Sequence, residues 1–187
     1  MMKIFLPTLD LGKKMLNCLK VKFIPVLKES KDYPLPLLKG EDYESVGLVF
    51  NDVGLVGSSA PVVGVKCSKT IESLLFQKQP NIQQLIEQLK IFSENEFFHH
   101  EWVENIYSCI EGQISGDMDG IEDLKIFLYD NSFISSKFVF KDAKKEWEPV
   151  VYRLPAMYSK YPNLTQFLFK INDITTDDIF FSHEKNS

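Results

Sequence analysis

The chain has 187 residues, of which 44% are hydrophobic and 25% charged. These proportions are ordinary for a globular protein and exclude disordered and fibrous classes. The formal net charge is −5, and all but one of the 21 basic residues are Lys, the exception being Arg153. Nucleic-acid binders usually cluster basic residues and include several Arg. Because the Lys residues here are scattered among acidic ones, we expect no nucleic-acid partner.

The three cysteines, Cys18, Cys67 and Cys109, are widely spaced and include no CxxC pair. An odd number without such pairs does not indicate a disulfide framework or a zinc site, and a reduced, cytosolic setting fits best. The N-terminus lacks the long apolar run of a signal peptide, and no window reaches the length that a membrane span needs. We therefore expect a soluble, cytoplasmic protein.

The first 67 residues predict mostly short extended segments. A helix is expected over residues 8–20, followed by a short strand at residues 23–27, where Pro25 suits a strand edge or end. Between residues 28 and 66, Pro and Gly punctuate the apolar runs at 46–50 and 61–65. This pattern predicts short strands with tight turns, which would form a small, mostly antiparallel sheet.

The remainder of the chain predicts a mainly helical part. Ser68 is a candidate cap for a helix, and two strongly periodic helices are expected over residues 81–93 and 98–113, packed against each other. One more helix is expected at residues 121–129, a strand at residues 138–140 and a final helix capped by Asn163. The fold class is thus α+β. We expect a single domain over residues 1–187, with a soft boundary near residue 67 between a strand- and loop-rich part and a mainly helical part.

Candidate chemical motifs are incomplete. His99-His100 lacks the HExxH spacing of a zinc site, and adjacent histidines on a helix point about 100° apart. The glycine-containing run at residues 54–59 lacks the Lys of a phosphate-binding loop and predicts a β-turn instead. The calcium-loop opening at residues 117–120 lacks the later ligands. We identify no catalytic, cofactor-binding or metal-binding residue, and expect a non-catalytic protein without a cofactor. A small nucleotide- or metal-dependent hydrolase is the alternative.

An ordered set of short segments resembles the internal repeats of the sacsin family. Leu37-Leu38 stands where that family has an aromatic residue, and the remaining segments follow the family's order from about residue 20 to residue 180. The segments are Phe23-Ile24-Pro25-Val26-Leu27, Asp32-Tyr33-Pro34-Leu35-Pro36, Lys39-Gly40, Leu55-Val56-Gly57-Ser58, Pro61-Val62-Val63, Gln88-Leu89-Lys90, Phe133-Ile134, Tyr152-Arg153-Leu154-Pro155, Phe167-Leu168 and Thr175-Thr176-Asp177-Asp178.

The resemblance implies a segment that follows the ATPase-like module of such a repeat. The nucleotide-binding motifs of that module have no counterpart here. A non-catalytic scaffold of a large cytosolic co-chaperone would follow, acting in protein quality control. Its partners would be protein clients and other modules of the parent chain, with a link to heat-shock chaperones and intermediate filaments through the full-length protein. The purely structural alternative is a spacer that only positions other modules. The candidate interaction surface comprises Tyr33, Pro34, Leu35, Pro36, Trp102 and Trp147.

Overall fold

The computed structural model describes most of the middle of the chain, and the expected helix at residues 8–20 lies outside this part. The described residues are 22, 24–38, 41–44, 48–66, 68–69, 72, 76–77, 79–114, 121–140 and 152–169. The chain divides into two compact units, Met1–Cys109 and Ile110–Ser187. The change of composition near residue 67 lies inside the first unit. The helix expected after Ser68 falls largely on undescribed residues.

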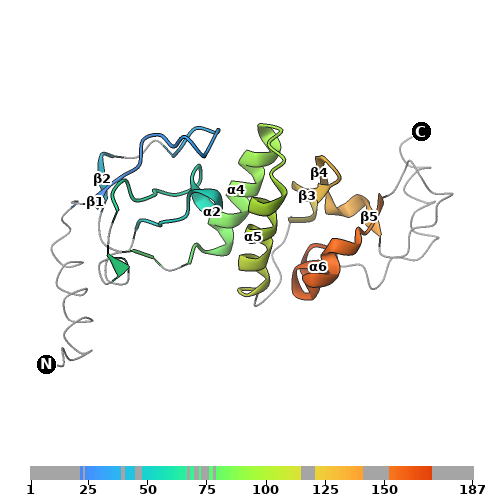
Figure 1. The fold of residues 1–187 in the computed structure, drawn as a ribbon. Helices are drawn as coiled ribbons and strands as arrows, with labels where there is room; N and C mark the ends of the chain where they lie inside the picture. Colours follow the sequence, from blue (N-terminus) through green and yellow to red (C-terminus); the bar gives the residue numbers. More distant parts are fainter. Residues whose placement is uncertain are drawn as a thin grey trace, which may run out of the picture. The chain divides into compact units, whose positions relative to one another are not determined.

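Short extended segments make up most of the N-terminal part of the first unit (Figure 1). Buried side chains there form two small hydrophobic clusters. Strands β1 (Ile24–Pro25) and β2 (Tyr43–Glu44) pair antiparallel, and single bridges join Val26 to Val63 and Phe50 to Val62. The buried members of the two clusters are Ile24, Val26, Val49 and Phe76 in one, and Phe50, Val56, Ala60 and Val62 in the other. Pairing is confined to a few residues at a time because Pro and Gly interrupt each run.

A short helix, α2 (Val53–Val56), replaces the β-turn that the glycine-containing run predicted. The helix forms because Asp52 caps its N-terminus: Asp52 Oδ1 accepts hydrogen bonds from the amides of Gly54, at 2.9 Å, and Leu55, at 3.2 Å. The β-turn prediction is therefore wrong, and the missed signal is the Asp before the apolar run.

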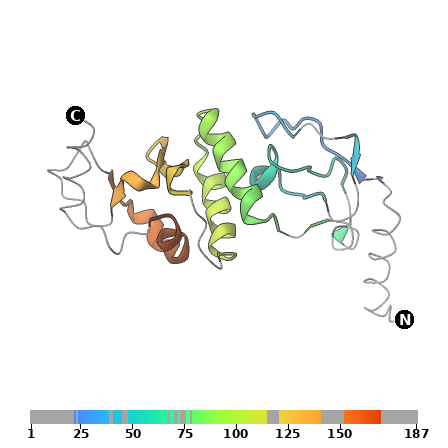
Figure 2. The same cartoon turned by 180° about the vertical axis from the view of Figure 1, so that it is seen from behind.

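Helices α4 (Ile82–Glu94) and α5 (His100–Glu111) agree with the two periodic helices predicted from the sequence. Asn81 and Gln84 form a reciprocal capping box at the start of α4. The two helices lie side by side in both views (Figures 1 and 2), and the rings of Phe92 on α4 and Trp102 on α5 are 6.4 Å apart. The periodicity predicts eight packing residues on the two helices, and all but one of them are buried. The exception, Ile82, is half-buried, and the buried ones are Leu85, Ile86, Leu89, Val103, Ile106, Tyr107 and Ile110.

The second unit contains a β-hairpin where a helix was predicted. A 3-10 turn, η1 (Ile121–Asp123), leads into strand β3 (Lys125–Tyr129), which pairs antiparallel with β4 (Ser132–Ser135). The two-residue connection places Asp130 at a positive φ of 50°, a conformation that Asp adopts more readily than most residues. The prediction of a helix at residues 121–129 is therefore wrong, because the buried run Ile126–Leu128 packs as a strand.

The rest of the described part of the second unit packs on η1 and on this hairpin. It comprises η2 (Ser136–Phe138), β5 (Val139–Phe140), β6 (Tyr152–Arg153), η4 (Ala156–Lys160) and α6 (Pro162–Phe169). The strand predicted at residues 138–140 is present as β5, which pairs parallel with β6. The ring of Tyr158 stacks on Phe127 at 4.1 Å, and its hydroxyl donates a hydrogen bond of 2.8 Å to the Leu128 carbonyl.

The architecture is α+β, as the sequence predicted. Two of the described strand pairs are antiparallel, but they are not confined to the N-terminal part, since β3–β4 belongs to the second unit. No helix within the described ranges is both long and apolar enough to cross a bilayer.

Candidate interaction site

A buried polar network joins three distant segments of the first unit. Tyr33, Ser58 and Gln88 are 3%, 8% and 0% exposed, respectively. The Tyr33 hydroxyl lies 2.6 Å from Ser58 Oγ and 2.6 Å from Gln88 Nε2. The network thus ties the Pro-rich segment to the turn after α2 and to the middle of α4.

The direction of each hydrogen bond follows from the number of protons available. Ser58 Oγ donates its single proton to the Pro36 carbonyl, at 2.6 Å, so it accepts from Tyr33. The Tyr33 hydroxyl in turn accepts from Gln88 Nε2, which is only a donor. The chain of donors therefore runs from Gln88 through Tyr33 and Ser58 to the backbone of Pro36.

The carbonyl end of the Gln88 side chain is also satisfied. Gln88 Oε1 accepts from the amides of Ser58, at 3.0 Å, and Ser59, at 3.2 Å. Burying an amide without partners would cost several kcal/mol, about 2–7, so these contacts are what permit a polar side chain here. Gln88 falls three residues after Leu85 and four before Phe92, inside the buried stripe of α4. A polar residue in that position was the available sequence signal of a buried network.

Burial raises the pKa of the Tyr33 hydroxyl above its ordinary value, and the hydrogen bonds with Ser58 and Gln88 offset part of that rise. The phenol is therefore neutral over the physiological pH range. Its role is to donate and accept hydrogen bonds within the fold.

Gly57 allows the Pro-rich segment to approach the turn after α2. The Leu38 amide donates a hydrogen bond of 2.8 Å to the Gly57 carbonyl. A Cβ at Gly57 would lie 2.6 Å from the Val53 carbonyl oxygen and 3.1 Å from Leu37 Cδ2. A larger residue would clash first with the Val53 backbone one turn earlier, so α2 itself requires the glycine, and the contact with Leu37 adds to the crowding.

Trp102 is half-buried in an aromatic cluster. Its ring stacks on Tyr33 at 5.5 Å and on His99 at 4.6 Å. A Cβ at Gly54 would come within 3.3 Å of the indole, so α2 covers another part of the ring. Offset aromatic stacking stabilises such a cluster beyond the area that it buries. Trp102 thus helps to hold the Pro-rich segment, α2 and α5 together.

The predicted interaction surface is only partly exposed. Tyr33 is buried, so the expectation that it faces a partner is wrong: its hydroxyl is needed inside the network. Pro34 and Pro36 are exposed, and Leu35 is half-buried between them. Trp147 lies outside the described residues. Within the candidate surface, Pro34 and Pro36 are therefore the residues that a partner could reach directly.

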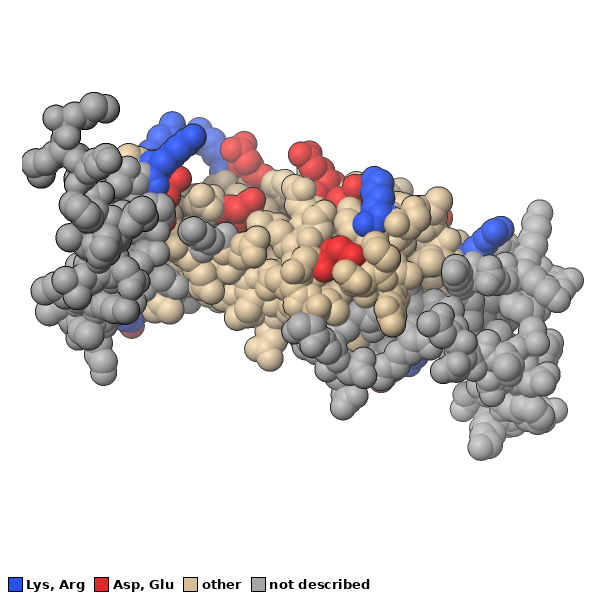
Figure 3. Space-filling view, turned by 90° about the horizontal axis from the view of Figure 1, so that it is seen from below, with Lys and Arg blue, Asp and Glu red and all other residues tan. Residues whose placement is uncertain are grey.

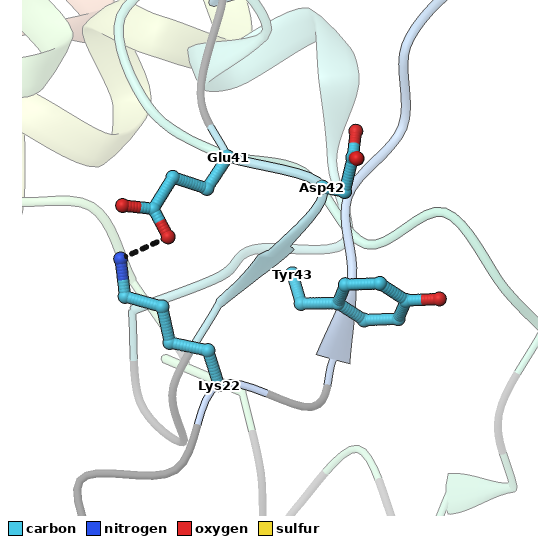
Figure 4. A pocket seen from close by; sticks show the side chains of 4 residues that line it. All are labelled: Lys22, Glu41, Asp42 and Tyr43. Carbon is cyan, nitrogen blue, oxygen red and sulfur yellow. Dashed lines mark ion pairs between the residues drawn. The ribbon is translucent and has the colours of Figure 1, made fainter.

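A shallow hollow lies beside β2 (Figure 4). Its volume is about 480 Å³, and Lys22, Glu41, Asp42 and Tyr43 line it. Lys22 forms an ion pair with Glu41, and their hydrogen bond raises the pKa of Lys22. A second ion pair, from Lys28 to Asp42 at 2.6 Å, lowers the pKa of Asp42. The charges at this hollow are therefore largely paired among themselves.

His99 and His100 do not form a metal centre with other described residues. His99 Nδ1 accepts a weak hydrogen bond of 3.4 Å from the Trp102 amide, at the start of α5, and His100 is exposed. Among the residues that the structure describes, no group of three or more His, Cys, Asp and Glu is close enough to hold a metal ion. On the face in Figure 3, both basic and acidic side chains occur among uncharged ones.

Comparison of the chain with protein-family models, with curated proteins and with solved structures finds no match.

Proposed function

We propose that this chain is a non-catalytic interaction module of a large, sacsin-like cytosolic co-chaperone, which supports client handling in protein quality control. The observation that carries the proposal is the Tyr33–Ser58–Gln88 network. Its members come from three of the segments on which the family resemblance rests.

The three side chains form hydrogen bonds with one another and so stabilise the fold. Three separate segments of the ordered set converge on one buried point, and the polar side chains there bond internally. A set of motifs that builds one structural element is what a scaffold needs. An enzyme would instead aim such groups at a substrate.

The segment that the network anchors exposes a short ridge of apolar side chains to solvent. Tyr33 and Ser58 anchor the segment from inside, through the Tyr33 hydroxyl and the Pro36 carbonyl, while Pro34, Pro36 and Leu38 are exposed. An anchored loop loses little conformational entropy when a partner binds. Extended, apolar segments of an unfolding client are the partners that such a ridge suits.

The proposal is tested by the aggregation of a chemically unfolded reporter enzyme in the presence of the purified chain. We expect light scattering to fall as the molar ratio of chain to reporter rises. Pro34→Ser combined with Leu38→Ser should weaken this protection, because both changes remove exposed apolar surface. Asp32→Ser, an exposed change in the same segment, is the matched control. A folded chain that leaves scattering unchanged at every ratio contradicts client handling.

Titration calorimetry with ATP and magnesium tests the alternative of a nucleotide-dependent hydrolase. Triphosphate sites need backbone amides gathered at a glycine-rich turn, together with a Lys or Arg and a magnesium ligand. In the first unit the amides of Gly54 and Leu55 bond to Asp52, and those of Ser58 and Ser59 to Gln88. We expect only the heat of dilution. Saturable heat that disappears without magnesium would favour the enzyme.

A further inference from the structure

One tyrosine differs from all the others in its exposure. The chain has seven tyrosines, and the structure describes all of them. Four are buried, at 0–6% exposure: Tyr33, Tyr107, Tyr158 and Tyr161. Tyr129 and Tyr152 are half-buried, and their rings pack on each other at 4.8 Å. Tyr43 alone exposes half of its surface, 50%.

Tyr43 stands on an edge of the small N-terminal sheet. Strand β2 pairs with β1 on one side, through Tyr43 opposite Pro25, and no strand within the described residues pairs with its other side. The Tyr43 ring points away from the Lys22–Glu41 ion pair (Figure 4). An enzyme that binds its substrate as an extended segment would find Tyr43 on extended backbone with its ring directed outward.

Strand β2 pairs with β1 over only two residues, Tyr43 and Glu44. Beside this ladder, the Val26 amide donates a backbone hydrogen bond of 3.0 Å to the Asp42 carbonyl, and two ion pairs join Lys22 to Glu41 and Lys28 to Asp42. All four of these charged side chains are exposed, and ion pairs in such positions contribute little to stability. Local opening of β2 is therefore easier than opening of the buried core.

The residues around Tyr43 are acidic. Glu41 and Asp42 precede it and Glu44 follows it directly. Kinases and their substrates are matched by complementary charge patterns. We propose that Tyr43 is a phosphorylation site for a tyrosine kinase whose substrate groove is basic. This inference does not depend on the proposed function.

The reaction transfers one phosphoryl group from ATP. A bond forms between Tyr43 Oη and the γ-phosphorus as the bond from that phosphorus to the β,γ-bridging oxygen breaks, and ADP leaves. The phenol proton passes to the catalytic aspartate of the kinase. No oxidant or reductant is involved.

The modification would weaken the pairing of β2 with β1. A phosphate adds between one and two negative charges at neutral pH, about −1.5 to −2, beside Glu41, Asp42 and Glu44. Like charges at this density repel, and Lys22 and Lys28 already pair with Glu41 and Asp42. The Val26 amide, which bonds to Asp42, should then exchange its hydrogen faster, whereas the Phe50 amide, which bonds to Pro61, should not.

The test is incubation of the folded chain with magnesium, ATP and a tyrosine kinase that selects acidic flanking residues, followed by peptide mapping by mass spectrometry. We expect one phosphate, on Tyr43, and its loss in Tyr43→Phe but not in Tyr129→Phe. Replacing Glu41, Asp42 and Glu44 by Gln, Asn and Gln should slow incorporation severalfold. The urea-unfolded chain, diluted into the assay, controls for access.

Three outcomes would overturn the proposal. The first is a folded chain modified mainly at another tyrosine. The second is a folded chain that stays unmodified while the unfolded chain accepts phosphate at Tyr43. The third is no incorporation in either form. An unchanged rate of phosphate incorporation in the variant without the three acidic side chains would contradict recognition of Tyr43 by a basic substrate groove.

Discussion

The side-chain amide of Gln88 donates a hydrogen bond of 2.6 Å to the hydroxyl of Tyr33, although the two residues are 55 positions apart in the chain. Both side chains are buried. The same glutamine receives two backbone amides at the turn after α2. This single side chain therefore fixes the position of the Pro-rich segment and of the turn at once.

We predict that Gln88→Leu destabilises the first unit by about 1–3 kcal/mol, because it leaves buried donors and the Tyr33 hydroxyl without their partner. The measurement is urea unfolding followed by Trp102 fluorescence in a Trp147→Phe background, since the chain has two Trp. Gln83→Leu, an exposed change on the same helix, is the control. Equal midpoints for the two variants would contradict the role of the network.

We predict that Leu89→Ala lowers the free energy of unfolding by about 2–5 kcal/mol. Leu89 is fully buried, at 0% exposure, on the face of α4 that carries Phe92. The matched control is Leu48→Ala, since Leu48 is 51% exposed. An unchanged denaturant midpoint for Leu89→Ala would mean that this face of α4 is not part of the core.

A third prediction concerns the start of α6. The Glu111 carboxylate accepts hydrogen bonds from the amides of Asn163, at 3.0 Å, and Leu164, at 2.7 Å, and so caps a helix from 52 residues away in the chain. Glu111→Ala should cost about 0.5–2 kcal/mol, the range for lost N-caps, and should speed hydrogen exchange at these two amides. Glu111→Gln should cost less because its amide oxygen still accepts. Unaltered exchange in Glu111→Ala would exclude the cap.

Sequence periodicity predicted the helices well and the hairpin badly, for a physical reason. In α4 and α5 the apolar residues recur with the helical period over three turns, so one structure is favoured. Around β3, Ile121, Leu124 and Leu128 also share helical spacing, while Ile126–Leu128 forms a short continuous apolar run. Such short runs suit either structure, and pairing with β4 decides the outcome.

The candidate site was predicted in part. The resemblance singled out the segments of Tyr33, Ser58 and Gln88. The linear sequence does not indicate, however, that their polar groups lie in contact. Tyr33 was expected at the surface because Pro-rich segments usually lie there. Its neighbours Pro34 and Pro36 are indeed exposed. Burial of Tyr33 depends on tertiary contacts with α4 and with Trp102, which local sequence does not specify.

The thiols provide a fourth prediction. Burial, and secondly the charge of Asp52, raise the pKa of Cys109, so its thiolate is scarce and its reaction with Ellman's reagent in the folded chain should be slow. Denaturation without reductant should release three reactive thiols, the total number of cysteines. A count of one would reveal a disulfide and contradict the expected reducing environment.

The last prediction follows from the pKa of Tyr33, which burial raises above 10.0 in the folded chain. The folded state prefers the neutral phenol, so the contribution of Tyr33 to stability is complete below the unfolded pKa, about 10. It is lost as the pH rises through the folded pKa, because the unfolded chain then releases the proton more easily. Tyr33→Phe lacks this ionisation and retains all the others.

The measurement is the free energy of unfolding of both proteins between about pH 8 and about pH 11, a range that spans the ordinary tyrosine pKa. The gap between the parent and Tyr33→Phe should be constant at the lower end and should narrow above the ordinary tyrosine pKa. Ionisation of lysines affects both proteins alike and cancels in the difference. A gap that stays constant across the range would mean that Tyr33 ionises as easily in the folded chain as in the unfolded one. The burial that raises the pKa of the Tyr33 hydroxyl would then be contradicted.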